Sequence, residues 1–211
     1  MFKKSLSLML LVALVVMGSG CAKGTIETGA VSDQNVYSNE YFKMNISLPE
    51  DWTIASEEEM NQMMEAGNEI AAGDDTGKKL ALELSKLKTV YLFTASNPNG
   101  NGSSFVGIAE NLSLNKDIKS GEDYLNHVKE SLEELQGQVP YQFNKDIYTK
   151  NIGGKEFGVL EAMVDIGAEV PLMQYYYVAI ENNYALCFLS TSVTDEDLIV
   201  LTNILPTVSF E

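Results

Sequence analysis

Few residues of the chain could serve nucleophilic catalysis. There is one histidine, His127, and there are two cysteines, Cys21 and Cys187. A serine or cysteine nucleophile needs an adjacent base, and a reactive thiolate needs a cationic neighbour. Cys187 instead stands in the apolar run Tyr184–Leu189, and His127 flanks the apolar seam of a predicted helix. We therefore expect a small buried hydrophobe at Cys187 and a partly exposed structural residue at His127, and we assign no catalytic residue.

Glycine-rich segments give no phosphate-binding loop. The segment Gly73–Lys79 has three residues between its glycines, where a phosphate loop has four, and Lys79 stands where Ser or Thr should follow the lysine. It also follows a predicted helix, whereas a phosphate loop follows a strand. Gly100 and Gly102 belong to a segment with the composition of a turn. The sequence therefore predicts no cofactor.

Acidic residues form three dense runs, at Glu57–Glu59, Asp74–Asp75 and Asp195–Asp197. With one histidine, a structural zinc site is excluded. None of the runs has the spacing of a calcium loop. The first and third precede predicted helices, where acids favour the helix dipole. We expect capping and solubility roles, with weak binding of a divalent cation and hydrolysis by paired carboxylates kept as alternative functions.

Three consecutive tyrosines, Tyr175, Tyr176 and Tyr177, lie in a predicted strand. Successive side chains of a strand point to opposite faces. Tyr175 and Tyr177 are thus expected on one face and Tyr176 on the other. One face belongs to the core, and the other could form an aromatic contact surface.

The N-terminus has the pattern of an export signal. Lys3 and Lys4 precede the apolar segment Leu6–Met17, which is followed by the small residues Gly18–Gly20 and then Cys21. This arrangement resembles a bacterial lipobox, although Gly18 replaces the usual branched apolar residue. The resemblance implies a lipid on the Cys21 thiol, palmitate-type acylation and an anchor on the outer side of the cell membrane. Ordinary signal cleavage and an uncleaved anchor are the alternatives.

Charge and length limit the function further. The chain has 211 residues with 30 acidic side chains against 14 basic ones, all lysine, for a formal net charge of −16. Nucleic-acid binding depends on neutralising phosphates with Lys and Arg, so no nucleic-acid partner is expected. A domain of this size folds without disulfides or metals.

Composition divides the chain into a signal peptide at 1–20, a flexible tether at 21–38 and one domain at 39–211. The tether is expected because residues 22–38 are small, polar and aperiodic. The apolar pattern predicts the strands and helices of an α+β fold, with an antiparallel sheet of about six to seven strands flanked by helices. The expected strands are Tyr41–Leu48, Trp52–Ile54, Thr89–Ala95, Phe105–Leu114, Tyr141–Thr149, Lys155–Ile166, Pro171–Ile180, Tyr184–Ser192 and Val208–Phe210. The expected helices begin after the capping residues Ser56, Ser120 and Thr194, and a further one is expected at Lys78–Leu87.

The order of these elements resembles the PsbP-like family, whose fold is shared with a Ran-binding nuclear transport factor. The likeness rests on Tyr41-Phe42, on Ile46–Trp52 with its Leu-Pro-x-x-Trp ending, and on the closing helix and strand at Leu198–Phe210. Similar openings occur in exported lipoproteins of Gram-positive bacteria, including clostridial ones. The resemblance implies a PsbP-like α/β/α sandwich and no catalytic motif. We thus expect a non-enzymatic binding or adaptor lipoprotein, held to the membrane through lipid on Cys21, with a cell-envelope protein as a candidate partner.

Overall fold

The computed structural model describes residues 26–72, 88–99, 102–134, 139–165 and 171–211. Cys21, the whole of the expected helix at Lys78–Leu87 and the acids Asp74–Asp75 lie outside these residues. The elements in chain order are β1 (Ala30–Val31), β2 (Val36–Asn39), β3 (Met44–Ser47), β4 (Thr53–Ile54), α2 (Glu57–Ala72), β5 (Thr89–Ser96), β6 (Ser104–Asn111), α4 (Gly121–Glu134), β7 (Tyr141–Gln142), β8 (Tyr148–Ile152), β9 (Lys155–Val164), β10 (Leu172–Glu181), β11 (Tyr184–Ser192), α5 (Asp195–Ile204), the 3-10 turn η1 (Leu205–Thr207) and β12 (Ser209–Phe210).

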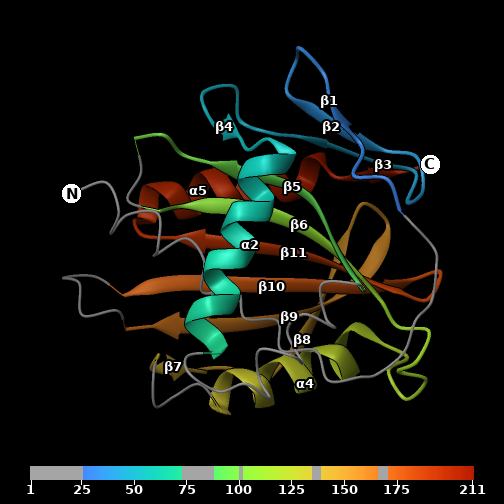
Figure 1. The fold of residues 1–211 in the computed structure, drawn as a ribbon, viewed down its shortest axis with the longest axis vertical. Helices are drawn as coiled ribbons and strands as arrows, with labels where there is room; N and C mark the ends of the chain where they lie inside the picture. Colours follow the sequence, from blue (N-terminus) through green and yellow to red (C-terminus); the bar gives the residue numbers. More distant parts are fainter. Residues whose placement is uncertain (1–25, 73–87, 100–101, 135–138, 166–170) are drawn as a thin grey trace.

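The expected α+β fold class is confirmed. An eight-stranded antiparallel sheet has the order β4-β5-β6-β11-β10-β9-β7, with β8 pairing to β9 beside β7. Two-residue turns join β8 to β9 and β10 to β11. Their central residues, Gly153-Gly154 and Asn182-Asn183, all have positive φ, as the tight type I′ hairpin turn requires. Many strands that are neighbours in the sheet are therefore also consecutive in the chain and joined by short connections (Figure 1).

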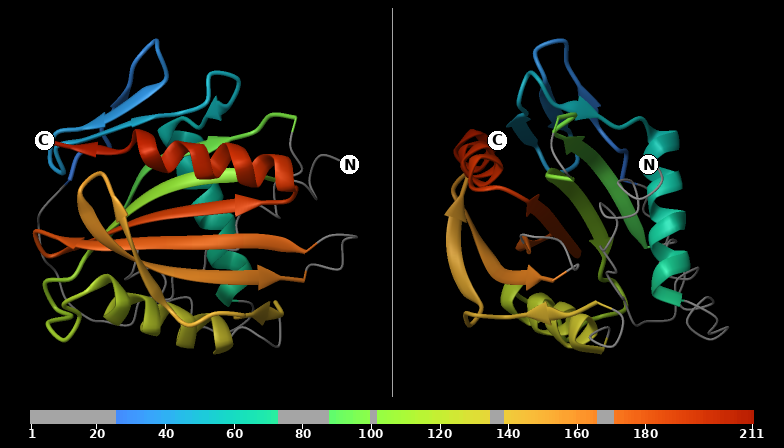
Figure 2. Two further views of the ribbon diagram at one scale, coloured as in Figure 1. Left: turned by 180° about the vertical axis from the view of Figure 1, so that it is seen from behind. Right: turned by 90° about the vertical axis from the view of Figure 1, so that its left-hand side faces the viewer.

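Each face of the large sheet is covered. Figure 2 shows α5 on one face and α2 with α4 on the other, which gives the expected sandwich. Side chains on the α5 face form one core, to which Phe93, Phe188 and Leu201 belong. Those on the α4 face form a second core, which includes Leu125, Leu132 and other residues. Among the described helices, none is both long and apolar enough for a membrane crossing.

The predicted helix caps are confirmed. In each case the capping hydroxyl accepts from the backbone N–H three residues later, and the acid at that later position accepts from the capping residue in return. The pairs are Ser56 with Glu59, Ser120 with Asp123, and Thr194 with Asp197. These three contacts fix where α2, α4 and α5 begin.

The described part of the tether segment is folded, which corrects the prediction for residues 26–38. β1 and β2 lie there and join β3 and β12 in a second, four-stranded sheet. Tyr37 is 1% exposed, packs on Phe93 and donates a hydrogen bond from its hydroxyl to the carbonyl of Thr28. Ile26 is also buried. These two apolar anchors, standing in a polar segment, bring residues 26–38 into the domain.

Two strand predictions are also corrected. The strand expected at Tyr41–Leu48 begins only at Met44, because residues 40–43 form a turn in which Lys43 has a positive φ. The strand expected at Tyr141–Thr149 is divided into β7 and β8. Both pair with β9, at opposite ends of that long strand, so the intervening residues must leave the sheet. The final strand, β12, pairs with β3 in the small sheet and not with the large one.

Helix α4 approaches the large sheet very closely at its first residue. A Cβ built on Gly121 would lie 2.0 Å from the carbonyl oxygen of Val178, and one built on Gly158 would lie 2.8 Å from the carbonyl carbon of Gly121. Real Cβ atoms do not reach such distances, so only glycine fits at both positions. Because Gly121 and Gly158 have no side chains, α4 can pack closely against β9 and β10.

Candidate functional site

The two residues considered for nucleophilic chemistry lie apart. Cys187 is 1% exposed in the core on the α4 face, and burial raises the pKa of its thiol to about 12. His127 is on the outer side of α4, where its Nδ1 lies 3.8 Å from Glu130. The structure therefore places Cys187 as a buried hydrophobe and His127 as an exposed residue, as the sequence predicts.

The first and third acidic runs lie at the N-termini of α2 and α5. Within the described ranges, no three His, Cys, Asp or Glu side chains are grouped so that they could hold a metal ion. Asp197 has a structural role, since its carboxylate accepts from the hydroxyls of Ser103 and Thr194 and from the amide of Asn97, at 2.7–2.9 Å. Burial alone would raise the pKa of Asp197, but these three hydrogen bonds outweigh it and hold the pKa below its usual value. This network ties the start of α5 to the β5–β6 loop.

A buried carboxyl group lies between β6 and α4. Glu110 is 1% exposed, and its Oε2 accepts a hydrogen bond from the Tyr124 hydroxyl at 2.6 Å. Its Oε1 is buried and has no hydrogen-bond partner. Burial raises the pKa of Glu110 to about 7, although the bond from Tyr124 and the positive charge of Lys88 act in the opposite direction. A carboxyl with this pKa exchanges protons near neutrality, and here it is buried between β6 and α4.

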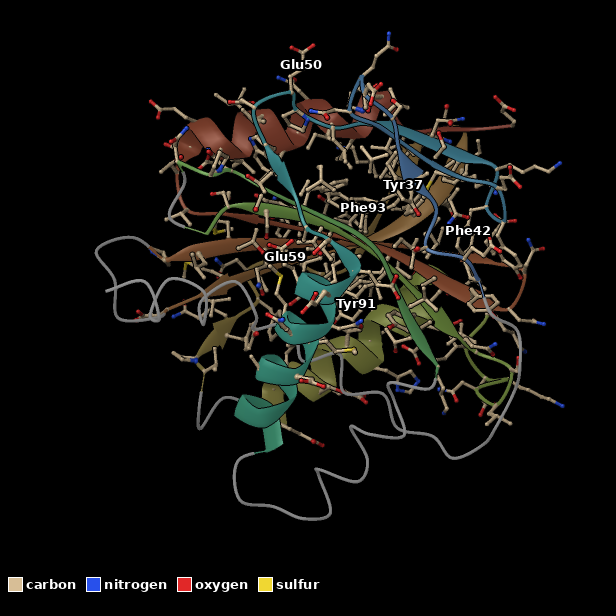
Figure 3. All side chains as sticks on the ribbon, turned by 45° about the horizontal axis from the view of Figure 1, so that its top comes forward. Tyr37, Phe42, Glu50, Glu59, Tyr91 and Phe93 are labelled. Carbon is tan, nitrogen blue, oxygen red and sulfur yellow. The ribbon has the colours of Figure 1, made fainter. Side chains whose placement is uncertain are left out.

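Tyr91 joins this buried group because strand β5 is irregular. The register of β5 against β6 shifts between Tyr91 and Phe93. Residues two apart on a regular strand share a face, yet Tyr91 packs on the α4 core and Phe93 on the α5 core (Figure 3). Burial, with the neighbouring Cys187, raises the pKa of the Tyr91 hydroxyl to about 12. Glu110, Tyr124 and Cys187 thus form a group of polar side chains buried in the core, and the partly buried Tyr91 lies beside them.

An accessible surface of different character lies over β8, β9 and β10. It comprises the exposed side chains of Tyr148 and Lys150 and the partly exposed Tyr175, and we call it the β8 surface. Tyr177 lies beneath it, is 6% exposed and belongs to the core on the α5 face. The pairing Tyr148↔Val159 and Tyr177↔Val159 places the two tyrosines in one row across the three strands. The rings of Tyr175 and Tyr177 are parallel within 11°, with centroids 6.3 Å apart. Tyr148 is 39% exposed, so the surface presents aromatic area to solvent.

Charged groups hold the β8 surface in place. Glu161 is the central one: its carboxylate accepts from the Tyr148 hydroxyl at 2.8 Å and pairs with Lys145 at 2.8 Å. Lys150 is exposed and lies 5.9 Å from the centre of the Tyr177 ring, within reach of a cation–π attraction. Tyrosines whose hydroxyls and neighbouring rings are fixed lose little entropy on forming a contact. The arrangement fixes the orientation of Tyr148 and holds Lys150 beside the Tyr177 ring.

The sequence indicated part of this surface. Tyr175 and Tyr177 share a face, as strand alternation predicted, and Tyr176 lies in the opposite core. Tyr177 is also buried, so of the aromatic surface considered for one of these faces only the partly exposed Tyr175 remains. Tyr148 and Lys150 were missed because their place depends on the pairing of β8 with β9. Glu110 was missed as well, although an acid within the apolar run Phe105–Leu112 was a visible signal.

Comparison with known proteins gives the fold. The solution structure of cyanobacterial PsbP (CyanoP) from Synechocystis sp. PCC 6803 matches with a TM-score of 0.53 and 12% identity, over 92% of this chain and 99% of that protein. A crystal structure from Bacteroides thetaiotaomicron VPI-5482 matches with a TM-score of 0.41 and 14% identity, over 80% of this chain and 45% of that one. No family model and no curated protein matches. The fold of the chain is therefore PsbP-like, as the sequence resemblance implied.

Proposed function

We propose that this protein is a lipid-anchored binding module on the outer face of the cell membrane, which acts as a non-enzymatic adaptor for a cell-envelope protein. The observation that carries the binding role is the β8 surface. Aromatic residues concentrate in the contact areas of protein interfaces, and here the exposed Tyr148 and Lys150 lie beside the partly exposed Tyr175, with the buried Tyr177 supporting them from the core. The anchor rests on the lipobox-like segment before Cys21.

The charge of the protein supports the same role. A net charge of −16 keeps the domain soluble and repels it from anionic lipid. On such an acidic chain, a surface formed by tyrosines and a lysine differs from its surroundings in charge and in aromatic character. A partner that docks there is recognised by aromatic packing and by one local positive charge, and the acidic remainder of the surface discourages non-specific contacts.

The anchor is tested by replacing Cys21 with alanine. We expect the wild-type chain to sediment with membranes, and Cys21→Ala to appear in the soluble extracytoplasmic fraction, because its thiol can no longer carry lipid. The measurement is cell fractionation followed by mass spectrometry of the N-terminal peptide. An unmodified Cys21 in a membrane-bound wild type would contradict lipid anchoring.

The binding surface is tested by the double variant Tyr148→Ser, Lys150→Glu. We expect its yield of crosslinked partner from native membranes to fall about tenfold, which corresponds to a loss of about 1.4 kcal/mol. The matched control is Ile199→Ser, which changes an apolar residue that is 62% exposed on α5. A partner captured equally by the wild type and both variants would show that binding occurs elsewhere on the domain.

A further inference from the structure

Strand β8 forms an edge of the large sheet. It pairs with β9 on one side, and no described strand pairs with its other side. Four of its five residues, Tyr148–Asn151, are exposed. An edge of this kind presents a row of backbone N–H and C=O groups that match another extended chain. At about 3.4 Å per residue, the open edge is roughly 17 Å long.

The hairpin turn determines which backbone groups point outward. In a two-residue turn the flanking residues, here Ile152 and Lys155, form a hydrogen-bonded pair. Bonded and non-bonded pairs alternate along an antiparallel ladder. Lys150 and Tyr148 therefore bond to β9, while the N–H and C=O groups of Thr149 and Asn151 point away from it. No described backbone group bonds to these outward groups.

The side chains beside the edge favour one kind of partner. Lys145 pairs with Glu161, and Lys155 pairs with Glu181. Lys150 has no carboxylate partner among the described residues, and it lies on the same face as Tyr148. A strand added along β8 would set its own side chains next to these two residues, so an acidic side chain next to Lys150 would gain a charge-assisted contact.

A second copy of the chain fits this edge poorly. An antiparallel pair of β8 strands centred on Lys150 would bring the two Lys150 side chains together, and like charges directly opposite on neighbouring strands are destabilising. Each copy also carries a net charge of −16, which disfavours association. Pairing with a second copy in this register is therefore disfavoured, whereas a strand with an acidic residue opposite Lys150 meets no such repulsion.

From these observations we propose that β8 binds an extended segment of a partner protein as an added β-strand, with an acidic side chain of that segment next to Lys150. This inference rests on the proposed binding function and specifies its mode. Main-chain hydrogen bonds to Thr149 and Asn151 supply affinity, and the contacts with Tyr148 and Lys150 supply specificity.

The test uses a displayed library of random ten-residue peptides, selected on the full chain held in detergent micelles. We expect the recovered peptides to carry an acidic residue and to bind Thr149→Pro at least tenfold more weakly than the wild type. Proline removes only an outward N–H at this position, and edge strands tolerate it there. Thr149→Val keeps the N–H and is expected to bind within twofold of the wild type.

Backbone amide exchange on the wild-type chain gives a second measurement that needs no variant. The amides of Thr149 and Asn151 should exchange quickly in the free protein and slowly with a bound peptide. Strand addition is overturned if they stay unprotected, if Thr149→Pro binds normally, or if no peptide is recovered. In each of these cases, a partner still captured from membranes and lost from Tyr148→Ser, Lys150→Glu would leave the proposed function standing.

Discussion

Replacing Gly158 with alanine is expected to lower the free energy of unfolding by about 3 kcal/mol, the upper range for overpacking a well-filled core. The added Cβ would lie 2.8 Å from the carbonyl carbon of Gly121 and 2.9 Å from the amide nitrogen of Glu122. Both are backbone atoms, which no rotamer change can move. Helix α4 must therefore lift away from β9 and β10 and weaken the packing of Leu125 and Leu132 below it.

Urea unfolding measures the loss in the free energy of unfolding, and amide exchange shows which elements are destabilised. We expect faster exchange along α4 than along β11 in the Gly158→Ala variant. The matched control is Thr149→Ala, which changes the residue paired with Gly158 on exposed β8 and should change stability by less than about 1 kcal/mol. A Gly158→Ala variant as stable as the wild type would show that α4 does not depend on this close approach.

Replacing Glu110 with glutamine is expected to remove a large pH dependence of stability. The pKa of Glu110 is raised in the folded protein, from 4.5 to about 7, so the folded state holds this proton more tightly than the unfolded state does. The associated stability is complete below about pH 4.5 and is lost as the pH rises through about 7. At about 1.4 kcal/mol per pKa unit, the loss is about 3 kcal/mol.

The measurement is the free energy of unfolding of the wild type and Glu110→Gln at several values between pH 5 and pH 8.5. Glutamine stays neutral and still offers an oxygen to the Tyr124 hydroxyl, so we expect the variant to gain about 2.5 kcal/mol relative to the wild type between pH 5 and pH 8.5. Glu133→Gln, which neutralises an exposed acid on α4, should follow the wild type. If the free energy of unfolding depends on pH in the same way for the wild type and Glu110→Gln, then Glu110 does not titrate near neutrality.

Features encoded by neighbouring residues were predicted well from the sequence. The capping residues Ser56, Ser120 and Thr194 each bond within four residues of themselves, so their effect is visible in a short window. The Asn182-Asn183 turn likewise specifies the β10–β11 hairpin, because both residues tolerate positive φ. These signals between neighbouring residues were sufficient to predict the fold class from the sequence.

Features that depend on distant partners were missed. Residues 26–38 lack an apolar period, and their order depends on tertiary contacts such as the packing of Tyr37 on Phe93, more than fifty residues later. The opposite faces of Tyr91 and Phe93 follow from a bulge that breaks the two-residue period without a marker in the sequence. Of the β8 surface, the face on which Tyr175 lies was predicted from alternation, whereas the positions of Tyr148 and Lys150 required the register of β8 on β9.

The pairing of β3 with β12 has a consequence for the order of folding. Met44 and Asn45 bond to the last strand, and the backbone N–H of Ser47 bonds to the Thr207 hydroxyl, 160 residues away. Contacts so distant in sequence form late, because a long loop must close first. While the chain is synthesised from its N-terminus, one edge of β3 therefore stays open until Phe210 arrives. Within the described residues, the small sheet is therefore expected to close after the hairpins of the large sheet.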